Sequence, residues 1–382
     1  MSTNKVLLLL VAATLLGCAD PAPESQREMT TEWLVTQAAG MDALLLIGAA
    51  SGDVMQAHIY PEAIAFVRDN MSEDGLAAMA ELDATLRQKL GQLTGPTLAY
   101  VFSAGPIASL EDVIESAADP VGRLQPGLEM SPHWDAQEFE KISRMMPTVH
   151  RALTALRDIG FNDWYASTQL PNITPAVQAN KEAVQDFDVI PEQERLLGRT
   201  LDPGIEIVVV GFARPYGMRI LGQRFVAYYA WEANIQLRVA AHELFHPPYD
   251  PDDAELAELL TELEQDTWMN SIVENHDPKF GYNSFMGVVN EGSTQALDQI
   301  VSDRLGFAED PGERWRESDG GMHMLAAALY HAMREDGFPE SGGNYSEWFK
   351  SALRRGLLDP ASVKDRATTI VGAETVALWD KT

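Results

Sequence analysis

The chain has 382 residues, of which 57 are Asp or Glu and 28 are Lys or Arg, so its formal net charge at pH 7 is −29. Nucleic acid is not expected as a partner, because such a surface repels phosphate. Hydrophobic residues make up 46% of the sequence, which is enough for one large core or two smaller ones. The single cysteine, Cys18, excludes internal disulfides and a thiolate metal cluster.

The N-terminus has the features of an export signal that ends in a lipid anchor. Lys5 precedes a short apolar core, residues 6–16, and Leu15-Leu16-Gly17-Cys18 resembles the lipobox of bacterial lipoproteins. The core is too short to cross a bilayer as a permanent helix. The resemblance implies that residues 1–17 are a signal peptide, that Cys18 is acylated, and that the lipid holds the protein in the cell envelope, outside the cytoplasm. The alternative is an ordinary secretory signal with an incidental cysteine.

Residues 18–28 are small, polar and proline-containing, as expected of a tether between a lipid and a folded body. From residue 29 to about residue 200, apolar residues recur at steps of three and four, as in Leu76, Met79, Leu82, Leu86 and Leu90. This spacing predicts a helical N-terminal region. No pattern there indicates chemistry.

The character of the sequence changes near Gly204. Residues 205–210 are rich in β-branched side chains, and residues 224–229 form a second such run after a glycine-punctuated connection. We expect two strands here, arranged as a hairpin. Helical periodicity then returns and continues to the C-terminus.

A metal-binding pattern follows these strands. Residues 242–246 read His-Glu-Leu-Phe-His, after a run of good helix formers with no breaker until Pro247. Positions four apart lie on one face of a helix, so His242 and His246 can bind one ion. Two neutral imidazoles supply half of the tetrahedral shell of Zn²⁺. Glu243 lies beside that ion without binding it, where it can act as the general base toward a water molecule.

The pentapeptide resembles the motif of the zincin metallopeptidases. The resemblance implies a sheet edge that lies over the motif helix and holds the substrate. We therefore expect an α+β fold in which helices predominate. It would comprise the helical N-terminal region, residues 29–200, and a zincin-like catalytic region with a small β-sheet, residues 201–382.

A catalytic zinc needs a third protein ligand and one open position. Asn290-Glu291-Gly292 resembles the glutamate helix of the gluzincins, which implies that Glu291 is the third ligand. Asp298, seven residues further on, shares a helix face with Glu291 and could orient a ligand histidine. Glu291 follows His246 by 45 residues (291 − 246), more than in thermolysin and its close relatives. Residues 254–273 account for the difference if they form one inserted amphipathic helix.

Other residues could take the place of Glu291. Glu264 and Asp266 lie at a thermolysin-like distance from His246, within an acidic run that is also typical of a solvated helix face. His276 and Asp250 lie in expected loops and could reach the ion through favourable turns.

Zincins also use a hydrogen-bond donor that stabilises the oxyanion formed when water attacks the carbonyl. The late helix, residues 321–336, carries His323, Tyr330 and His331 near one face. We expect Tyr330 as this donor, with His323 as the second choice.

The sequence thus predicts a lipid-anchored zinc metallopeptidase that acts on peptides or proteins outside the cytoplasm. Two alternatives remain open. One is a zinc hydrolase of another amide, such as a cell-wall substrate. The other is a non-catalytic binding or scaffold lipoprotein in which the pentapeptide is incidental.

Overall fold

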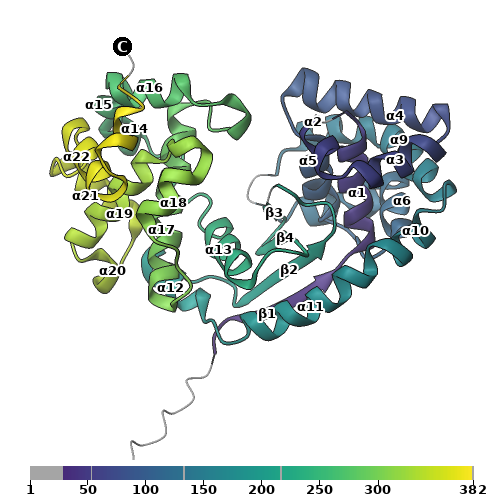
Figure 1. The fold of residues 1–382 in the computed structure, drawn as a ribbon, viewed down its shortest axis with the longest axis horizontal. Helices are drawn as coiled ribbons and strands as arrows, with labels where there is room; N and C mark the ends of the chain where they lie inside the picture. Colours follow the sequence, from purple (N-terminus) through teal and green to yellow (C-terminus); the bar gives the residue numbers. More distant parts are fainter. Residues whose placement is uncertain (1–28, 53, 132–133, 216, 381–382) are drawn as a thin grey trace, which may run out of the picture.

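A four-stranded mixed sheet lies between two groups of helices (Figure 1). The computed structural model describes residues 29–52, 54–131, 134–215 and 217–380, so the expected signal peptide, tether and Cys18 lie outside the described residues. Helices predominate, which confirms the α+β, mainly α, class. No helix within the described ranges has the length and apolar character required to cross a membrane.

The sheet has the strand order β1-β2-β4-β3, and its bounds are β1 Glu32–Gln37, β2 Gly204–Val210, β3 Met218–Ile220 and β4 Arg224–Tyr228. The two expected strands are confirmed as β2 and β4. They are parallel neighbours, so the expected hairpin between them is wrong. The hairpin partner of β4 is the short edge strand β3, which pairs with it in antiparallel register.

Strand β1 was not expected, and it joins the N-terminal region to the sheet. It pairs in parallel with β2, in a register that places Glu32 opposite Gly204. The region 29–200 is therefore not purely helical, and the expected boundary near residue 200 falls between two paired strands of one sheet. Helix α11 runs along β1 and covers it from one side (Figure 1).

The first group of helices packs around α1, eleven of whose twelve residues are buried. Asp42 on α1 is fully buried and ties this group to the sheet. Its Oδ1 accepts hydrogen bonds from the backbone N–H groups of Gly211 (2.7 Å) and Phe212 (3.1 Å), directly after β2. The Tyr165 hydroxyl donates to its Oδ2 at 2.8 Å. The elements of this group are α1 Ala39–Ala50, α2 Val54–Ile59, α3 Pro61–Asn70, α4 Glu73–Asp83, the π-helix Ala84–Lys89, α5 Thr94–Phe102, α6 Leu110–Ala118, α7 Pro120–Arg123, α8 Gln125–Leu128, α9 Ala136–Asp158 and α10 Phe161–Thr168.

The second group of helices contains the motif helix α13, which packs against both α17 and the sheet. Helix α17 is buried along most of its length and contacts α19 on another side. The helices outside the first group are α11 Leu170–Val184, α12 Val189–Leu197, α13 Ala233–Glu243, α14 Ala254–Leu259, α15 Thr261–Gln265, α16 Thr267–Asn275, α17 Phe285–Leu305, α18 Pro311–Glu317, α19 Met324–Glu335, α20 Phe338–Ser341, α21 Tyr345–Arg354, α22 Pro360–Val371 and α23 Ala373–Ala377, with short 3-10 turns at Pro278–Phe280 and Ser318–Gly321.

Residues 254–273 do not form the single inserted helix that we expected. They belong to the three short helices α14, α15 and α16, which meet at Leu260 and Asp266. The Asp266 side chain accepts a hydrogen bond from the Met269 N–H at 2.9 Å, so it caps the start of α16. An N-cap residue has non-helical backbone angles, which explains why α15 ends there.

Candidate metal centre

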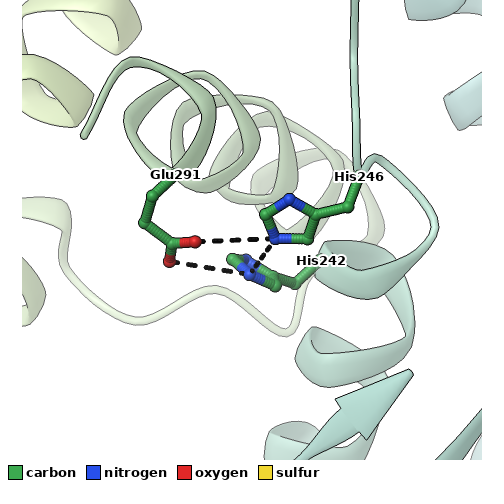
Figure 2. Close-up of side chains that lie close together, drawn as sticks. All are labelled: His242, His246 and Glu291. Carbon is green, nitrogen blue, oxygen red and sulfur yellow. Dashed lines mark hydrogen bonds and ion pairs between the residues drawn. The ribbon is translucent and has the colours of Figure 1, made fainter. Parts of the chain in front are cut away.

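His242, His246 and Glu291 lie together, although Glu291 is on a different helix from the motif (Figure 2). The Nε2 atoms of His242 and His246 are 2.9 Å apart. Oε1 of Glu291 lies 3.6 Å from Nε2 of His242, and Oε2 of Glu291 lies 3.5 Å from Nε2 of His246. One ligand atom from each residue lies within 4.8 Å of the other two. These three side chains could hold a metal ion.

His246 reaches the cluster from outside the motif helix. Helix α13 ends at Glu243, so His246 lies in the turn that follows, and not on the helix as expected. The ring of Pro247 disfavours helical angles at the residue before it, and this favours an early end of the helix. The guanidinium of Arg219 on β3 stabilises the turn, because its Nη1 donates to the carbonyls of Glu243 (3.2 Å) and His246 (2.8 Å).

Asp298 orients His242 from the side away from the cluster. Its Oδ2 lies 2.7 Å from Nδ1 of His242, and its side chain is fully buried. Burial alone would raise the pKa of Asp298, but the adjacent Arg314 guanidinium and the contact with His242 hold it below its usual range. An ionised Asp298 accepts a hydrogen bond from the Nδ1–H group of His242, which leaves the Nε2 lone pair of His242 directed at the cluster. Asp298 thus has the position that the sequence predicted.

Glu291 is held by residues that the sequence did not single out. The Gln295 side-chain amide donates to its Oε1 at 2.8 Å, and the Trp315 indole N–H donates to Gln295 at 2.8 Å. Burial raises the pKa of Glu291, but His242 and His246 outweigh that effect and lower it. Glu291 is therefore ionised and fixed, as a ligand for a cation should be.

The two histidines differ in their electrostatic surroundings. Burial opposes a charge on both rings. At His242 the carboxylates of Glu291 and Asp298 outweigh burial and raise the pKa, whereas at His246 the neighbouring His242 adds to burial and lowers it. The centre therefore attracts one positive charge, which a metal ion could supply in place of a proton.

Glu243 stands beside the cluster without belonging to it. Burial is the main cause of its raised pKa, and Glu291 raises it further, while His242 and Arg219 lower it. A carboxylate with a raised pKa is a better base than an exposed one. This environment suits the role of general base that was expected for Glu243.

Tyr282 lies at the centre and was missed by the sequence analysis. Burial, followed by the charge of the nearby Glu291 carboxylate, raises the pKa of its hydroxyl, so Tyr282 stays protonated. Its φ is 58°, a left-handed conformation that costs a non-glycine residue ~1–2 kcal/mol. Strain of this kind collects at functional sites. The ring of His323 packs edge-on against Tyr282 with centroids 5.8 Å apart, and His323 is close enough to Glu291 to help lower its pKa.

The structure does not bring Tyr330 to the cluster, contrary to our expectation. Its hydroxyl donates to Asp303 at 2.6 Å and accepts from Arg334 at 2.7 Å. Asp303 lies on the same helix as Glu291 but twelve residues later (303 − 291), or ~18 Å along the helix axis. His331 lies beside Glu335 on α19. Tyr330 and His331 therefore face away from the histidine pair.

The alternatives to Glu291 are also elsewhere. Glu264 is exposed on α15, and Asp266 is the cap of α16. The Asp250 carboxylate accepts the Asp252 N–H at 3.0 Å. The ring nitrogens of His276 lie 3.0 Å from the Ile272 carbonyl and 2.8 Å from the Gly281 carbonyl, so His276 fixes the loop that carries Tyr282.

A cleft of about 1500 Å³ opens beside the centre and is lined by His246 and Asn290. Its lining includes the edge strand β3 and residues of both helical groups. Three large apolar side chains, Tyr100, Met130 and Met286, line it and are exposed by 37%, 85% and 37%. The cleft can therefore accommodate an extended ligand with apolar side chains.

Comparison with models of protein families, with curated proteins and with solved structures gave no match. The interpretation of this centre therefore depends on its own chemistry. The centre contains the imidazoles of His242 and His246 and the buried carboxylate of Glu291. The carboxylate of Glu243 lies beside this cluster but is not part of it.

Proposed function

We propose that this protein is a zinc-dependent peptidase in which His242, His246 and Glu291 bind the metal and Glu243 is the general base. The observation that supports it is the convergence of these three ligands from α13, the turn after it and α17, with Glu243 left outside the cluster. Two imidazoles and one carboxylate form a donor set typical of catalytic zinc, and they leave one position open. Zinc bound there would polarise the scissile carbonyl and lower the pKa of the attacking water.

The remaining steps belong to side chains of this chain. Glu243 accepts a proton from the attacking water and delivers it to the leaving amine. The Tyr282 hydroxyl, which stays protonated, donates a hydrogen bond to the oxyanion, with His323 behind it. Asp298 keeps His242 in the tautomer that binds the metal. The edge strand β3, which lines the cleft, can pair with an extended peptide. The motif helix and the sheet edge then form a zincin-like unit.

The test compares Glu243→Gln with wild type for zinc content and for hydrolysis of fluorescence-quenched peptides. The variant should keep its zinc and lose at least a hundredfold in kcat/KM, since a positioned base contributes about 10²–10⁴-fold. Glu264→Gln, an exposed carboxylate on α15, is the matched control and should behave as wild type. Activity near wild type in Glu243→Gln would refute the mechanism. A wild-type protein that binds zinc but cleaves only other amides would redirect the proposal to a cell-wall substrate.

We also propose that the protein is anchored in the cell envelope through a lipid on Cys18. The support is the lipobox-like sequence and the polar residues 18–28. Cys18→Ser should move the protein from the detergent phase to the aqueous phase in Triton X-114 partitioning and leave peptide hydrolysis unchanged. Equal partitioning of variant and wild type would contradict the anchor.

A further inference from the structure

Two arginines, Arg199 and Arg219, line the cleft next to the metal centre. Arg219 is on the edge strand β3, and Arg199 follows the end of α12, where Gly198 adopts a φ of 65°. Burial is the main cause of the lowered pKa of Arg219. The charge of Glu243 opposes this effect, and the charge of Arg199 adds to it.

Within the described residues, no carboxylate forms an ion pair with either arginine. Among the residues that the structure describes, Arg219 donates only to the backbone carbonyls of Gly222, Glu243 and His246. These bonds use Nε and Nη1, and Nη2 has no partner there. Arg199 forms no hydrogen bond or ion pair in the same part of the chain. Arg199 is exposed, whereas Arg219 is half-buried and differs from the buried or half-buried Arg195, Arg224 and Arg314, which have carboxylate partners.

The acidic residues that line the cleft are already bound to other groups. Asp253 and Glu347 form ion pairs with Lys350 at 3.0 Å and 2.9 Å. The Asp250 carboxylate accepts a backbone N–H. Arg199 and Arg219 carry two positive charges and face the single charge of the Glu243 carboxylate, with which neither forms an ion pair, so this part of the cleft favours one further anion. Guanidinium groups match a carboxylate in shape.

The position of Arg219 beside the metal centre favours the terminal carboxylate of a peptide as that anion. Arg219 Nη1 lies 2.8 Å from the backbone oxygen of His246, the residue whose imidazole faces the metal position. Arg219 thus contacts the backbone of the same residue whose side chain faces the metal position. In a peptide, the last scissile carbonyl and the terminal carboxylate are also one residue apart, ~3.5 Å along an extended chain. The apolar side chains of Tyr100, Met130 and Met286 lie along the same cleft.

We propose that Arg199 and Arg219 bind the C-terminal carboxylate of a peptide substrate, so that the enzyme is a carboxypeptidase for peptides with apolar C-terminal residues. This inference rests on the proposed peptidase function. The reaction adds water across the last peptide bond. The water oxygen bonds to the carbonyl carbon, the C–N bond breaks, and the proton taken up by Glu243 goes to the amine of the released amino acid.

Binding to the zinc-loaded Glu243→Gln variant tests the site without turnover. The probes are three peptides of one sequence: one that ends in Leu with a free carboxylate, the same peptide as its C-terminal amide, and an amide that ends in Asp, whose only carboxylate there is in the side chain. Isothermal titration should show at least tenfold tighter binding of the free acid than of either amide, because one charge-assisted contact is worth about this factor.

Arg199→Met in the same background should reduce that preference to threefold or less. Lys350→Met is the matched control, since it removes a cleft cation that already has carboxylate partners, and it should leave the preference intact. Arg219→Lys is a second variant. It keeps the positive charge but loses part of the contact between the guanidinium group and the peptide carboxylate. Its zinc content verifies that the turn carrying His246 is preserved.

Equal binding of the free acid and the amide by Glu243→Gln would overturn the carboxylate site. It would leave the peptidase function intact provided that wild type cleaves either peptide. Tight binding of the Asp-terminated amide would also overturn it, since the site would then bind side-chain carboxylates. With wild type, mass spectrometry should show single residues lost from the C-terminus of the free acid only. Failure of wild type to cleave any peptide in a zinc-dependent way would refute the peptidase function itself.

Discussion

The imidazole of His242 is held between two carboxylates, with Asp298 Oδ2 2.7 Å from its Nδ1 and Glu291 Oε1 3.6 Å from its Nε2. Asp298 and Glu291 lie on one helix, seven residues apart (298 − 291). One rigid, buried helix therefore supplies both the third ligand and the group that orients the first. Arg314 supports this arrangement, because its Nη2 lies 3.0 Å from Oδ2 of Asp298.

Asp298→Asn should weaken zinc binding although it removes no ligand. The amide cannot favour the Nδ1-protonated imidazole as a carboxylate does, and losses of this kind cost about 10–100-fold in metal affinity. Competition with a chromophoric chelator would measure the zinc Kd, with circular dichroism to verify folding. Asp303→Asn is the control. It also removes one negative charge from α17, but at a position beside Tyr330, so it should leave the zinc Kd unchanged. A Kd within about threefold of wild type in folded Asp298→Asn would contradict this role.

Tyr282→Phe should lower kcat with little change in KM. The substitution removes a donor that acts on the transition state and keeps the ring that packs on His323. Loss of one oxyanion donor costs about 10²–10³-fold in kcat. Tyr330→Phe is the matched control, because its hydroxyl bonds to Asp303 and Arg334, and its kcat should remain that of wild type. A lower kcat in Tyr330→Phe alone would reverse our assignment.

Asp42→Asn should change how the free energy of unfolding depends on pH. Burial, only partly offset by hydrogen bonds from Tyr165, Gly211 and Phe212, raises the pKa of Asp42 from 3.8 to about 7. Between these values the folded protein keeps a proton that the unfolded chain has released, so the contribution of Asp42 to stability falls as the pH rises. Asn does not titrate and can still accept both backbone N–H groups.

The free energy of unfolding of Asp42→Asn, relative to wild type, should therefore rise between pH 4 and pH 7. The rise would be of the order of 4 kcal/mol for a shift of about three pKa units. Urea denaturation at several pH values within this window measures it. For Glu264→Gln the difference from wild type should stay constant through the same pH range. A constant or falling difference for Asp42→Asn would show that Asp42 is already ionised at low pH.

Several parts of the fold and centre could be predicted because their signals are local. The β-branched run at residues 205–210 identified β2, and the spacing of His242 and His246 identified the two imidazoles. Glu291 and Asp298 were found together because a seven-residue spacing keeps two side chains on one face of a helix. Strand β1 has no comparable signal, since Val35 is its only buried residue.

Other features depend on tertiary contacts or on short capping signals. Nothing in the sequence around Tyr282 indicates its left-handed backbone or its contact with Glu291. Tyr330 was assigned from its helix face, but the packing of α19 against α17 directs that face to Asp303. Two breaks did have signals in the sequence: Pro247 for the early end of α13, and Asp266 as an N-cap inside the expected helix of residues 254–273.

The central claim is that Glu291 completes a zinc site with His242 and His246. The most direct measurement is the zinc content of wild type, Glu291→Ala, Glu264→Ala and Asp266→Ala after loading with one equivalent of zinc and mild dialysis. All three variants lose one negative charge, so a general electrostatic effect would be the same in each. We predict about one zinc per chain in wild type, Glu264→Ala and Asp266→Ala, and loss of zinc in Glu291→Ala alone. Zinc retained by Glu291→Ala, or lost from wild type, would contradict the account.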